Sequence, residues 1–259
     1  MKSRTDGLGR DGGPGDIVVG CCGFPVGRRR YYAEFPAVEV QQTFYQLPRV
    51  ETARKWRAEA PPGFAFAMKA WQLVTHAPSS PTYRRLREPL TAPPDAYGWF
   101  RPTDEVREAW RRTFEVARAL DSPAIVFQCP ASFAPTETSV ANLRAFFRAA
   151  ERDGRTFVWE PRGEWPPELV ADVCRELRLV HGVDPFAGPT LGGDVAYFRL
   201  HGRGGHRYRY TDEDLRELLG RCQRELAAGR RPVYVMFNNV SMLDDARRFR
   251  ALVERDGRD

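Results

Sequence analysis

Eight short apolar segments alternating with helical patterns constrain this chain more than any other feature. The segments begin near residues 17, 38, 64, 124, 156, 179, 195 and 232. Such alternation predicts parallel strands joined by helices. The count of eight favours closing the sheet into a barrel, and no Gly-x-Gly-x-x-Gly turn follows the first segment to suggest an open doubly wound sheet. We therefore predict an α/β fold, a single (β/α)8 TIM barrel.

Apolar periodicity and capping residues define the expected elements. Strands are expected at 17–22, 38–45, 64–70, 124–129, 156–160, 179–183, 195–201 and 232–238, and helices at 51–60, 104–120, 136–151, 167–177, 211–227 and 242–253. Residues 77–104, rich in Pro and Ser, predict a long excursion from the barrel. The barrel domain is expected to span 17–255, after a lead-in of residues 1–16 whose Gly and charge content is typical of disorder.

Composition narrows the class of protein, the partners and the compartment that are expected. A hydrophobic content of 42% in 259 residues is enough for a sizeable core. The net charge of +6, carried mostly by arginine, mildly favours anionic partners, but solvated helix faces are the preferred explanation. The five cysteines form no Cys-x-x-Cys pair, which favours a reducing cytoplasm. No apolar run approaches the roughly 18 to 20 residues that span a bilayer, so no membrane partner is expected.

Polar side chains gather at the predicted carboxyl ends of the strands, where TIM barrels place their active sites. The candidates, in chain order, are Glu39, Gln41 and Thr43, Lys69 and His76, Gln128, Glu160 and Arg162, Asp184, Arg199 and His201, and Asn238 and Asn239. Successive side chains on a strand point to opposite faces. Arg199 therefore shares a face with Tyr197, whereas Phe198 takes the other face. We expect the polar faces to point into the barrel and to collect carboxylates, cations and amides at one mouth.

Two interpretations of this polar ring remain open. It is either a functional site or a network of ion pairs that plugs the barrel, with Glu160–Arg199 or Glu39–Lys69 as pairs, because buried charges need partners in any case. The functional interpretation is favoured for the ring as a whole, since a barrel that needs only stability fills these layers with Val, Ile and Leu.

Several stretches of the chain resemble the YecE-like family, also known as the domain of unknown function 72 family. They are VEVQQTFYQLPRVETARKW at 38–56, FAFAMKAWQLVTH at 64–76, FQCPASF at 127–133, VWEPRGEW at 158–165, VAYFRLHG at 195–202 and VYVMFNN at 233–239. The resemblance covers nearly the whole chain and implies a TIM barrel. The activity of this family is unassigned, so the resemblance points to site residues rather than to a reaction.

The resemblance implies site positions at Glu39, Thr43, Phe44 and Tyr45, at Lys69 and His76, at Gln128 and Pro130, at Glu160, Arg162 and Trp165, at Arg199, His201 and Gly202, and at Asn238 and Asn239. Tyr45 thereby joins the candidate site. The chain departs from the family pattern in five places. Cys22-Gly23-Phe24 stands where Ser-Gly-Trp is usual, Gln41 where Asn is usual, Pro161 where Phe is usual, and Gly163 where His is usual, and the region between His76 and Thr103 is shorter than usual. These departures bear on substrate choice and on activity itself.

The first candidate function is an enzyme that acts on a small phosphorylated or otherwise anionic substrate by general acid/base chemistry. Lys69, Arg162 and Arg199 would bind the anion. The catalytic candidates are Glu160 as general acid or base, His201 as its partner, and Lys69. The remaining candidates, Glu39, Gln41, Thr43, Tyr45, His76, Gln128, Asp184, Asn238 and Asn239, would bind and orient substrate. No cofactor is predicted.

Two alternatives belong to other classes. A divalent metal held by Glu160, Asp184 and His201 would make the protein a sugar isomerase or a phosphodiesterase or endonuclease, by analogy of fold alone. A non-catalytic nucleic-acid binder would use the basic runs at 28–30 and 84–87 and the Gly, Arg and Tyr residues of 201–210. No tight cluster of metal ligands stands in the sequence, and a loop beside an active site explains 201–210 as well.

Overall fold

The computed structural model describes residues 16–257, and its eight parallel strands close into a barrel in sequence order. The strands are β1 Ile17–Cys22, β2 Ala37–Val40, β3 Ala65–Lys69, β4 Ala124–Gln128, β5 Thr156–Glu160, β6 Val180–Val183, β7 Ala196–Leu200 and β8 Val233–Phe237. Closure comes from β1, which pairs with β8 as well as with β2. The predicted (β/α)8 fold is confirmed. The predicted lead-in, apart from Asp16, lies outside the described residues.

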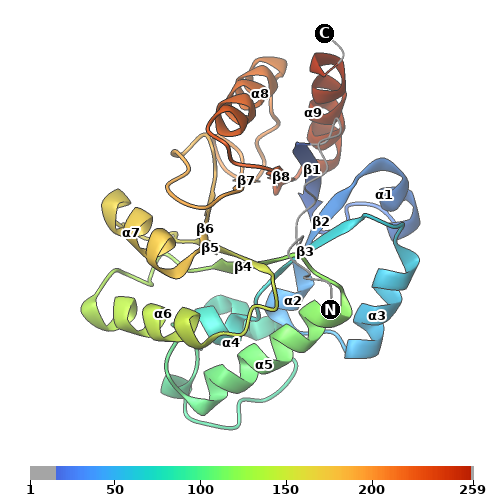
Figure 1. Cartoon of the computed structure of the whole chain (residues 1–259). Helices are drawn as coiled ribbons and strands as arrows, with labels where there is room; N and C mark the ends of the chain where they lie inside the picture. The colour runs from blue at the N-terminus through green and yellow to red at the C-terminus, as the bar shows by residue number, and fades with distance from the viewer. Residues whose placement is uncertain (1–15, 258–259) are drawn as a thin grey trace, which may run out of the picture.

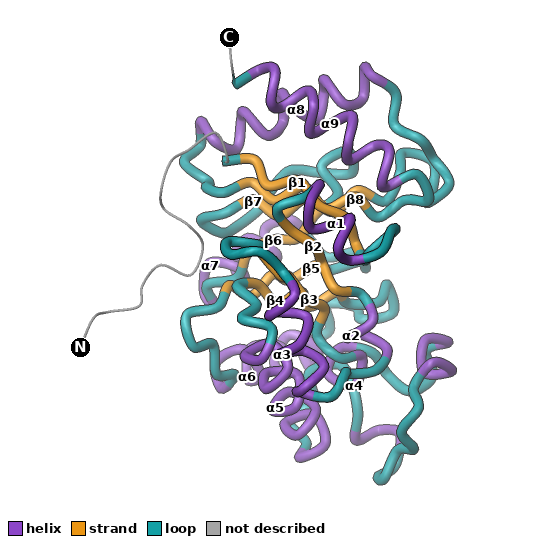
Figure 2. Tube along the Cα trace, turned by 90° about the vertical axis from the view of Figure 1, so that its right-hand side faces the viewer, coloured by secondary structure: helices purple, strands orange, loops and turns teal. Residues whose placement is uncertain are grey.

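Helices follow the strands along the chain and lie around the barrel (Figure 1). They are α1 Arg28–Glu34, α2 Gln42–Tyr45, α3 Val50–Glu59, α4 Gln72–Thr75, α5 Asp104–Ala119, α6 Glu137–Ala149, α7 Pro167–Leu177, α8 Asp212–Ala227 and α9 Met242–Asp256, with 3-10 turns at η1 Pro81–Arg85 and η2 Pro94–Ala96. Figure 2 shows the same arrangement from the side, with strands inside and helices outside. Within residues 16–257, no helix has the length and apolar content needed to cross a bilayer.

The second half of the chain follows the predicted boundaries closely, whereas the first half departs from them. The strand predicted at 38–45 is wrong beyond Val40, because Gln41 takes helical backbone angles and α2 follows at once. The Thr43 hydroxyl donates to the carbonyl oxygens of Val40 at 2.9 Å and Lys69 at 2.8 Å, which holds this turn against the end of β3. The short helices α1 and α4 were not predicted.

Side chains of the strands fill two separate cores. Inside the barrel, small residues such as Ala67 pack in one cluster with Tyr197, Tyr234 and Met236. Between strands and helices lies a larger apolar layer that includes Phe198 and Leu200. The predicted alternation along β7 is therefore confirmed. Alternation of this kind directs the polar side chains near the ends of the strands into the barrel.

Candidate active site

Arg199 lies at the centre of the polar cluster. It stands on β7, its guanidinium is inaccessible to solvent, and it reaches across the barrel to Glu39 on β2. Nη2 donates to Glu39 Oε1 at 2.7 Å and Nε donates to Oε2 at 2.9 Å. Nη1 donates to the carboxylate of Glu160 on β5 and to Gln128 Oε1 at 3.0 Å. The Arg199 cation thus joins β7 to β2, β4 and β5, and two buried carboxylates share it.

Glu160 extends this cluster outward to the rim of the barrel. Its Oε1 accepts from Arg162 Nε at 3.0 Å and lies 3.7 Å from His201 Nε2. Arg162 also contacts His201 directly. On the other side of His201, Nδ1 lies 3.6 Å from Asp184 Oδ2, which accepts from the His201 backbone N–H at 2.9 Å. Arg162 and His201 are partly exposed, so this end of the cluster meets solvent.

Lys69, at the end of β3, is buried but forms no ion pair in the described part of the chain. Its Nζ donates to Gln128 Oε1 at 2.9 Å and lies 3.9 Å from the centroid of the Phe44 ring. The predicted Glu39–Lys69 pair is therefore absent, because Arg199 takes both oxygens of Glu39. The predicted Glu160–Arg199 pair is present.

Burial and charge set the protonation of this cluster. Burial, and after it the Arg199 guanidinium, lower the pKa of the Lys69 ammonium to about 7. Burial opposes ionisation of Glu160, but Arg199 and Arg162 outweigh it and bring the pKa of that carboxyl to about 2. The pKa of Glu39 also lies below its ordinary value, because Arg199 outweighs burial. Near neutral pH the cluster therefore holds two carboxylates and one readily titrating amine.

Several predicted site residues lie close to this cluster with smaller roles in it. Gln41 donates to the carboxylate of Glu39. His76 is buried against Phe44, where burial, and after it the charge of Lys69, lower its pKa to about 3, so the imidazole is neutral. Asn238 follows β8, and its backbone N–H donates to the Leu200 carbonyl oxygen at 2.9 Å.

Three predicted residues are engaged elsewhere. Both hydrogen bonds of the Thr43 hydroxyl go to backbone carbonyl oxygens. The Tyr45 ring stacks under the guanidinium of Arg85, whose central carbon lies 3.6 Å from the centroid of the Tyr45 ring. Asn239 donates to Asp245 Oδ2 at 2.7 Å and to the Tyr208 carbonyl oxygen, so it holds the chain beside α9.

Three further residues complete the cluster, and of these only Phe44 was predicted from the sequence as a site position, through the family resemblance. Tyr197 donates its hydroxyl to Glu39 Oε2 at 3.0 Å, and its parity with Arg199 was the available signal. Phe44 packs against Nζ of Lys69, and only the turn of α2 brings it there. Cys22 lies against the Arg199 guanidinium, and burial, together with Glu39, raises the pKa of its thiol, so this sulfur is not activated.

Metal ligation does not suit this donor set. Among residues 16–257, no three His, Cys, Asp or Glu side chains are grouped to hold an ion. Glu160, Asp184 and His201, the predicted ligands, are interleaved with Arg162, and Glu160 already accepts from two guanidinium groups. A metal there would have to displace those cations.

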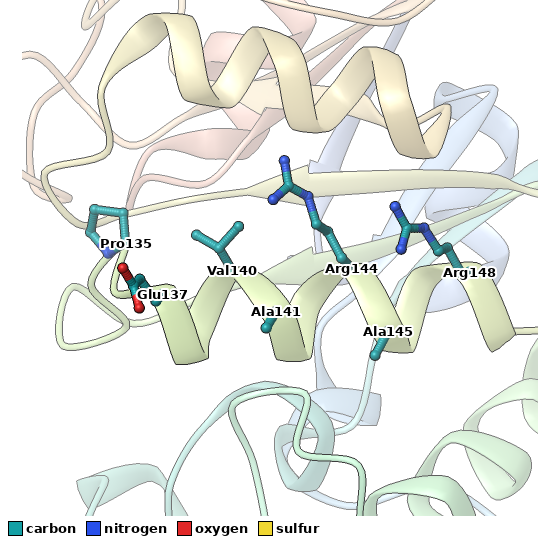
Figure 3. A pocket seen from close by; sticks show the side chains of 7 residues that line it. All are labelled: Pro135, Glu137, Val140, Ala141, Arg144, Ala145 and Arg148. Atoms are coloured by element: carbon teal, nitrogen blue, oxygen red, sulfur yellow. The ribbon is translucent and has the colours of Figure 1, made fainter.

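The hollow drawn in Figure 3 is a separate feature on the outer helical layer. Its lining comes from α6 and the residue Pro135 just before it. Arg144 and Arg148, which line it, pair with Glu176 on α7. None of the residues of the polar cluster lines this hollow.

A closed parallel barrel with charged side chains converging at the carboxyl ends of its strands defines a TIM-barrel protein. The chain belongs to the family described as "Protein of unknown function DUF72", whose model matches residues 27–259. No curated protein matches the chain.

Many solved structures share the fold, and three of them are representative. A DUF72 family protein from Enterococcus faecalis aligns at a TM-score of 0.73 with 18% identity, covering 92% of this chain and 95% of that one. A xylose isomerase domain containing protein from Salmonella typhimurium aligns at 0.61 with 12% identity, covering 97% and 100%. A D-allulose 3-epimerase from Methylomonas sp., in complex with D-allulose, aligns at 0.58 with 12% identity, covering 92% and 96%.

Proposed function

We propose that this protein is an enzyme that acts on a small phosphorylated or carboxylated substrate by proton transfer at the barrel mouth, with Lys69 as the group that exchanges the proton. The observation that carries the proposal is the buried Nζ of Lys69, held by the Gln128 amide and the Phe44 ring instead of a carboxylate. A buried amine used only for structure would be expected to have an anionic partner. An amine that titrates near neutral pH suits general acid/base catalysis.

The exposed rim of the cluster favours an anion. Glu39, Glu160 and Asp184 supply three negative charges, which are balanced by the charges of Arg162, Arg199 and protonated Lys69. At the rim, positive charge meets solvent through the Arg162 guanidinium, which is partly exposed. A guanidinium binds phosphate or carboxylate oxygens in a bidentate manner. Arg162 and His201 are therefore the expected contacts of the anionic group.

The carboxylates have a positioning role in this proposal. Glu160 stays ionised because Arg199 and Arg162 hold its pKa to about 2, so it is a poor proton donor at neutral pH. It orients Arg162 toward the rim by the Oε1–Nε hydrogen bond of 3.0 Å. Asp184 orients His201 in the same way, through the backbone N–H and the nearby Nδ1. The general acid/base role first considered for Glu160 thus passes to Lys69.

A sugar-sized substrate is favoured over a larger one. Two of the structures that share the fold carry names of sugar chemistry, xylose isomerase and D-allulose 3-epimerase, although at 12% identity they support the fold alone. The Gln128 amide in the cluster and the partly exposed imidazole of His201 are groups that form hydrogen bonds with hydroxyls, which suits a polyhydroxylated chain. We therefore infer a phosphorylated or carboxylated sugar derivative as the class of substrate.

The nucleic-acid alternative is weakened by the geometry of the loop after β7. Tyr210 is buried, so its ring is closed to a base, and the Tyr208 hydroxyl is already engaged as a donor to Asp214 Oδ2 at 2.7 Å. Arg203 pairs with Asp214 at 2.6 Å and with Glu217 at 3.0 Å. Base stacking on exposed aromatic rings is a main source of affinity for single strands.

Calorimetric titration of the full chain with inorganic phosphate tests the anion site. We expect binding that weakens at least about tenfold in Arg162→Met, since a charge-assisted hydrogen bond contributes about 1.5–3 kcal/mol. Arg175→Met is the matched control, because Arg175 is an exposed arginine on α7 paired with Asp172, and it should bind phosphate like the wild type. Equal phosphate affinity in all three proteins, or no binding to any, would overturn the proposed site.

A further inference from the structure

We propose that Lys69 is an amine nucleophile, which forms a covalent imine with a carbonyl group of the substrate. The substrate would then be a phosphorylated or carboxylated aldehyde or ketone. This inference rests on the proposed anion site and adds to it a bond between the protein and the substrate.

The hydrogen bonding of Lys69 leaves its nitrogen available. Gln128 Oε1 is shared, because it accepts from Lys69 Nζ at 2.9 Å and from Arg199 Nη1 at 3.0 Å. A neutral amine satisfies this single acceptor with one N–H and keeps its lone pair. A carboxylate partner would instead have stabilised the ammonium form, which has no lone pair.

Charged and titratable groups face Lys69 from several elements. They are Cys22 on β1, Glu39 on β2, His76 after α4, Glu160 on β5 and Arg199 on β7. Glu39 and Glu160 favour the ammonium, but each is hydrogen-bonded to Arg199, whose own charge opposes it. Burial adds to the effect of Arg199 and brings the pKa of Lys69 to about 7, so a large share of the amine is neutral at neutral pH.

Phe44 supplies a surface suited to the product of the reaction. Its ring centroid lies 3.9 Å from Nζ, within range of a cation–π interaction. A protonated imine carries its positive charge on the same nitrogen, so the ring face that contacts the ammonium would also contact the imine. The His76 ring packs edge-to-face against the Phe44 ring, with the two ring centroids 4.8 Å apart, and its lowered pKa keeps it neutral, so it adds no opposing charge.

The covalent step balances without an oxidant or a reductant. The lone pair of neutral Nζ forms a bond to the carbonyl carbon, and the π electrons of the C=O bond move to oxygen. One proton passes from nitrogen to that oxygen, which gives the carbinolamine. The oxygen takes a second proton from solvent and leaves as water, while the nitrogen lone pair forms the C=N bond of the protonated imine.

The lysine content of the chain makes the proposal easy to test. The sequence has three lysines, Lys2, Lys55 and Lys69, of which Lys2 lies outside the described residues. Lys55 stands on α3 with 73% of its side chain exposed and serves as an internal reference for a surface amine. The wild-type chain can therefore be examined directly, with no variant whose folding would have to be established first.

The experiment treats the full chain at pH 7 with glycolaldehyde phosphate and cyanoborohydride, and locates reduced adducts by peptide mass spectrometry. We expect Lys69 to be labelled at least about tenfold faster than Lys55, and inorganic phosphate to suppress labelling of Lys69 alone. Lys55→Met should leave labelling of Lys69 unchanged. Labelling of Lys55 with none at Lys69 would overturn the inference.

Unphosphorylated glycolaldehyde separates this inference from the proposed function. If it labels Lys69 as fast as the phosphorylated aldehyde does, and phosphate does not compete, imine formation is supported and the anion site is overturned. If phosphate binds in calorimetry and Arg162→Met weakens it, while Lys69 is not labelled, the anion site is supported and imine formation is overturned.

Discussion

The Arg199 guanidinium and the Glu39 carboxylate are joined by two hydrogen bonds across the barrel, at 2.7 and 2.9 Å, and neither side chain is accessible to solvent. Removing two charges from water is costly, so such a pair adds little net stability compared with apolar packing. Its importance lies elsewhere. By occupying both oxygens of Glu39, Arg199 leaves Lys69 without a carboxylate partner, and the proposed function of Lys69 depends on this arrangement.

Removal of Arg199 should destabilise the fold strongly. Arg199→Met leaves the Glu39 and Glu160 carboxylates buried without their shared cation, and the expected loss is about 3–5 kcal/mol in the free energy of unfolding. Urea denaturation followed by circular dichroism measures it. Arg111→Met, which removes an exposed arginine paired with Glu108 and Glu115 on α5, should change the free energy of unfolding far less, because exposed ion pairs contribute little. Equal losses in the two variants would contradict the network described here.

Lys69 should make stability rise with pH above neutrality. Its pKa is about 7 in the folded state and about 10.4 when unfolded, so the unfolded chain binds more protons between these values and stability increases with pH there. The slope contributed is at most about 1.4 kcal/mol per pH unit. Below pH 7 the cost of burying the amine is constant and largest.

The comparison of wild type with Lys69→Met isolates this contribution, because the buried cysteine thiols, whose pKa values are raised, act in the opposite direction in both proteins. We expect Lys69→Met to be the more stable protein at pH 7 and the difference to shrink toward pH 10. Chemical denaturation at several pH values provides the measurement. A difference independent of pH would show that Lys69 titrates normally.

His76 should contribute to loss of stability in acid. Burial holds its pKa at about 3, below the unfolded value of about 6.5, so the unfolded state takes up a proton first and stability falls as the pH drops from 6.5 toward 3. His181 behaves similarly, with a pKa of about 4. His76→Gln should therefore lose less stability than the wild type between pH 6.5 and 4.5. Parallel curves for the two proteins would contradict the burial of a neutral imidazole.

Gly20 on β1 should tolerate no side chain. A Cβ atom there would lie 2.5 Å from the Ala37 carbonyl oxygen on the neighbouring strand, so the strands would have to move. We expect Gly20→Ala to lower the melting temperature, with a cost of about 1–3 kcal/mol. Gly220→Ala, inside α8 and clear of close contacts, should instead stabilise the protein by about 0.5–1 kcal/mol. Effects of the same sign at both positions would contradict the tight contact between β1 and β2.

The sequence predicted the barrel well because its strands are apolar and its helices are amphipathic. β5 and α7 have the predicted bounds, and the alternation on β7 correctly placed Arg199 inside. The error after Val40 has a local cause: β-type residues such as Thr43 and Tyr45 favoured a longer strand, whereas side-chain hydrogen bonds to backbone favour a turn.

The hydrogen-bond and ion-pair partners within the site were not predictable from the sequence alone. Strand parity indicates which side chains point inward, but not which partner each one takes across the barrel. Glu39 had two cations within reach in principle, and only the register of β2, β3 and β7 decides that Arg199 takes it in place of Lys69. Phe44 reaches Lys69 through a turn that the pattern had assigned to a strand.

The protonation of Lys69, measured with and without an anion, is the sharpest test of the proposal that this amine exchanges the proton beside an anion site. The three lysines of the chain allow it to be followed by NMR of 13Cε-labelled lysine, with the Lys69 signal assigned by its loss in Lys69→Met. We predict that the Lys69 amine titrates with a midpoint near pH 7, and that this midpoint rises when saturating inorganic phosphate binds, because an anion stabilises the ammonium. A midpoint near the ordinary value of about 10.4, unchanged by phosphate, would contradict it.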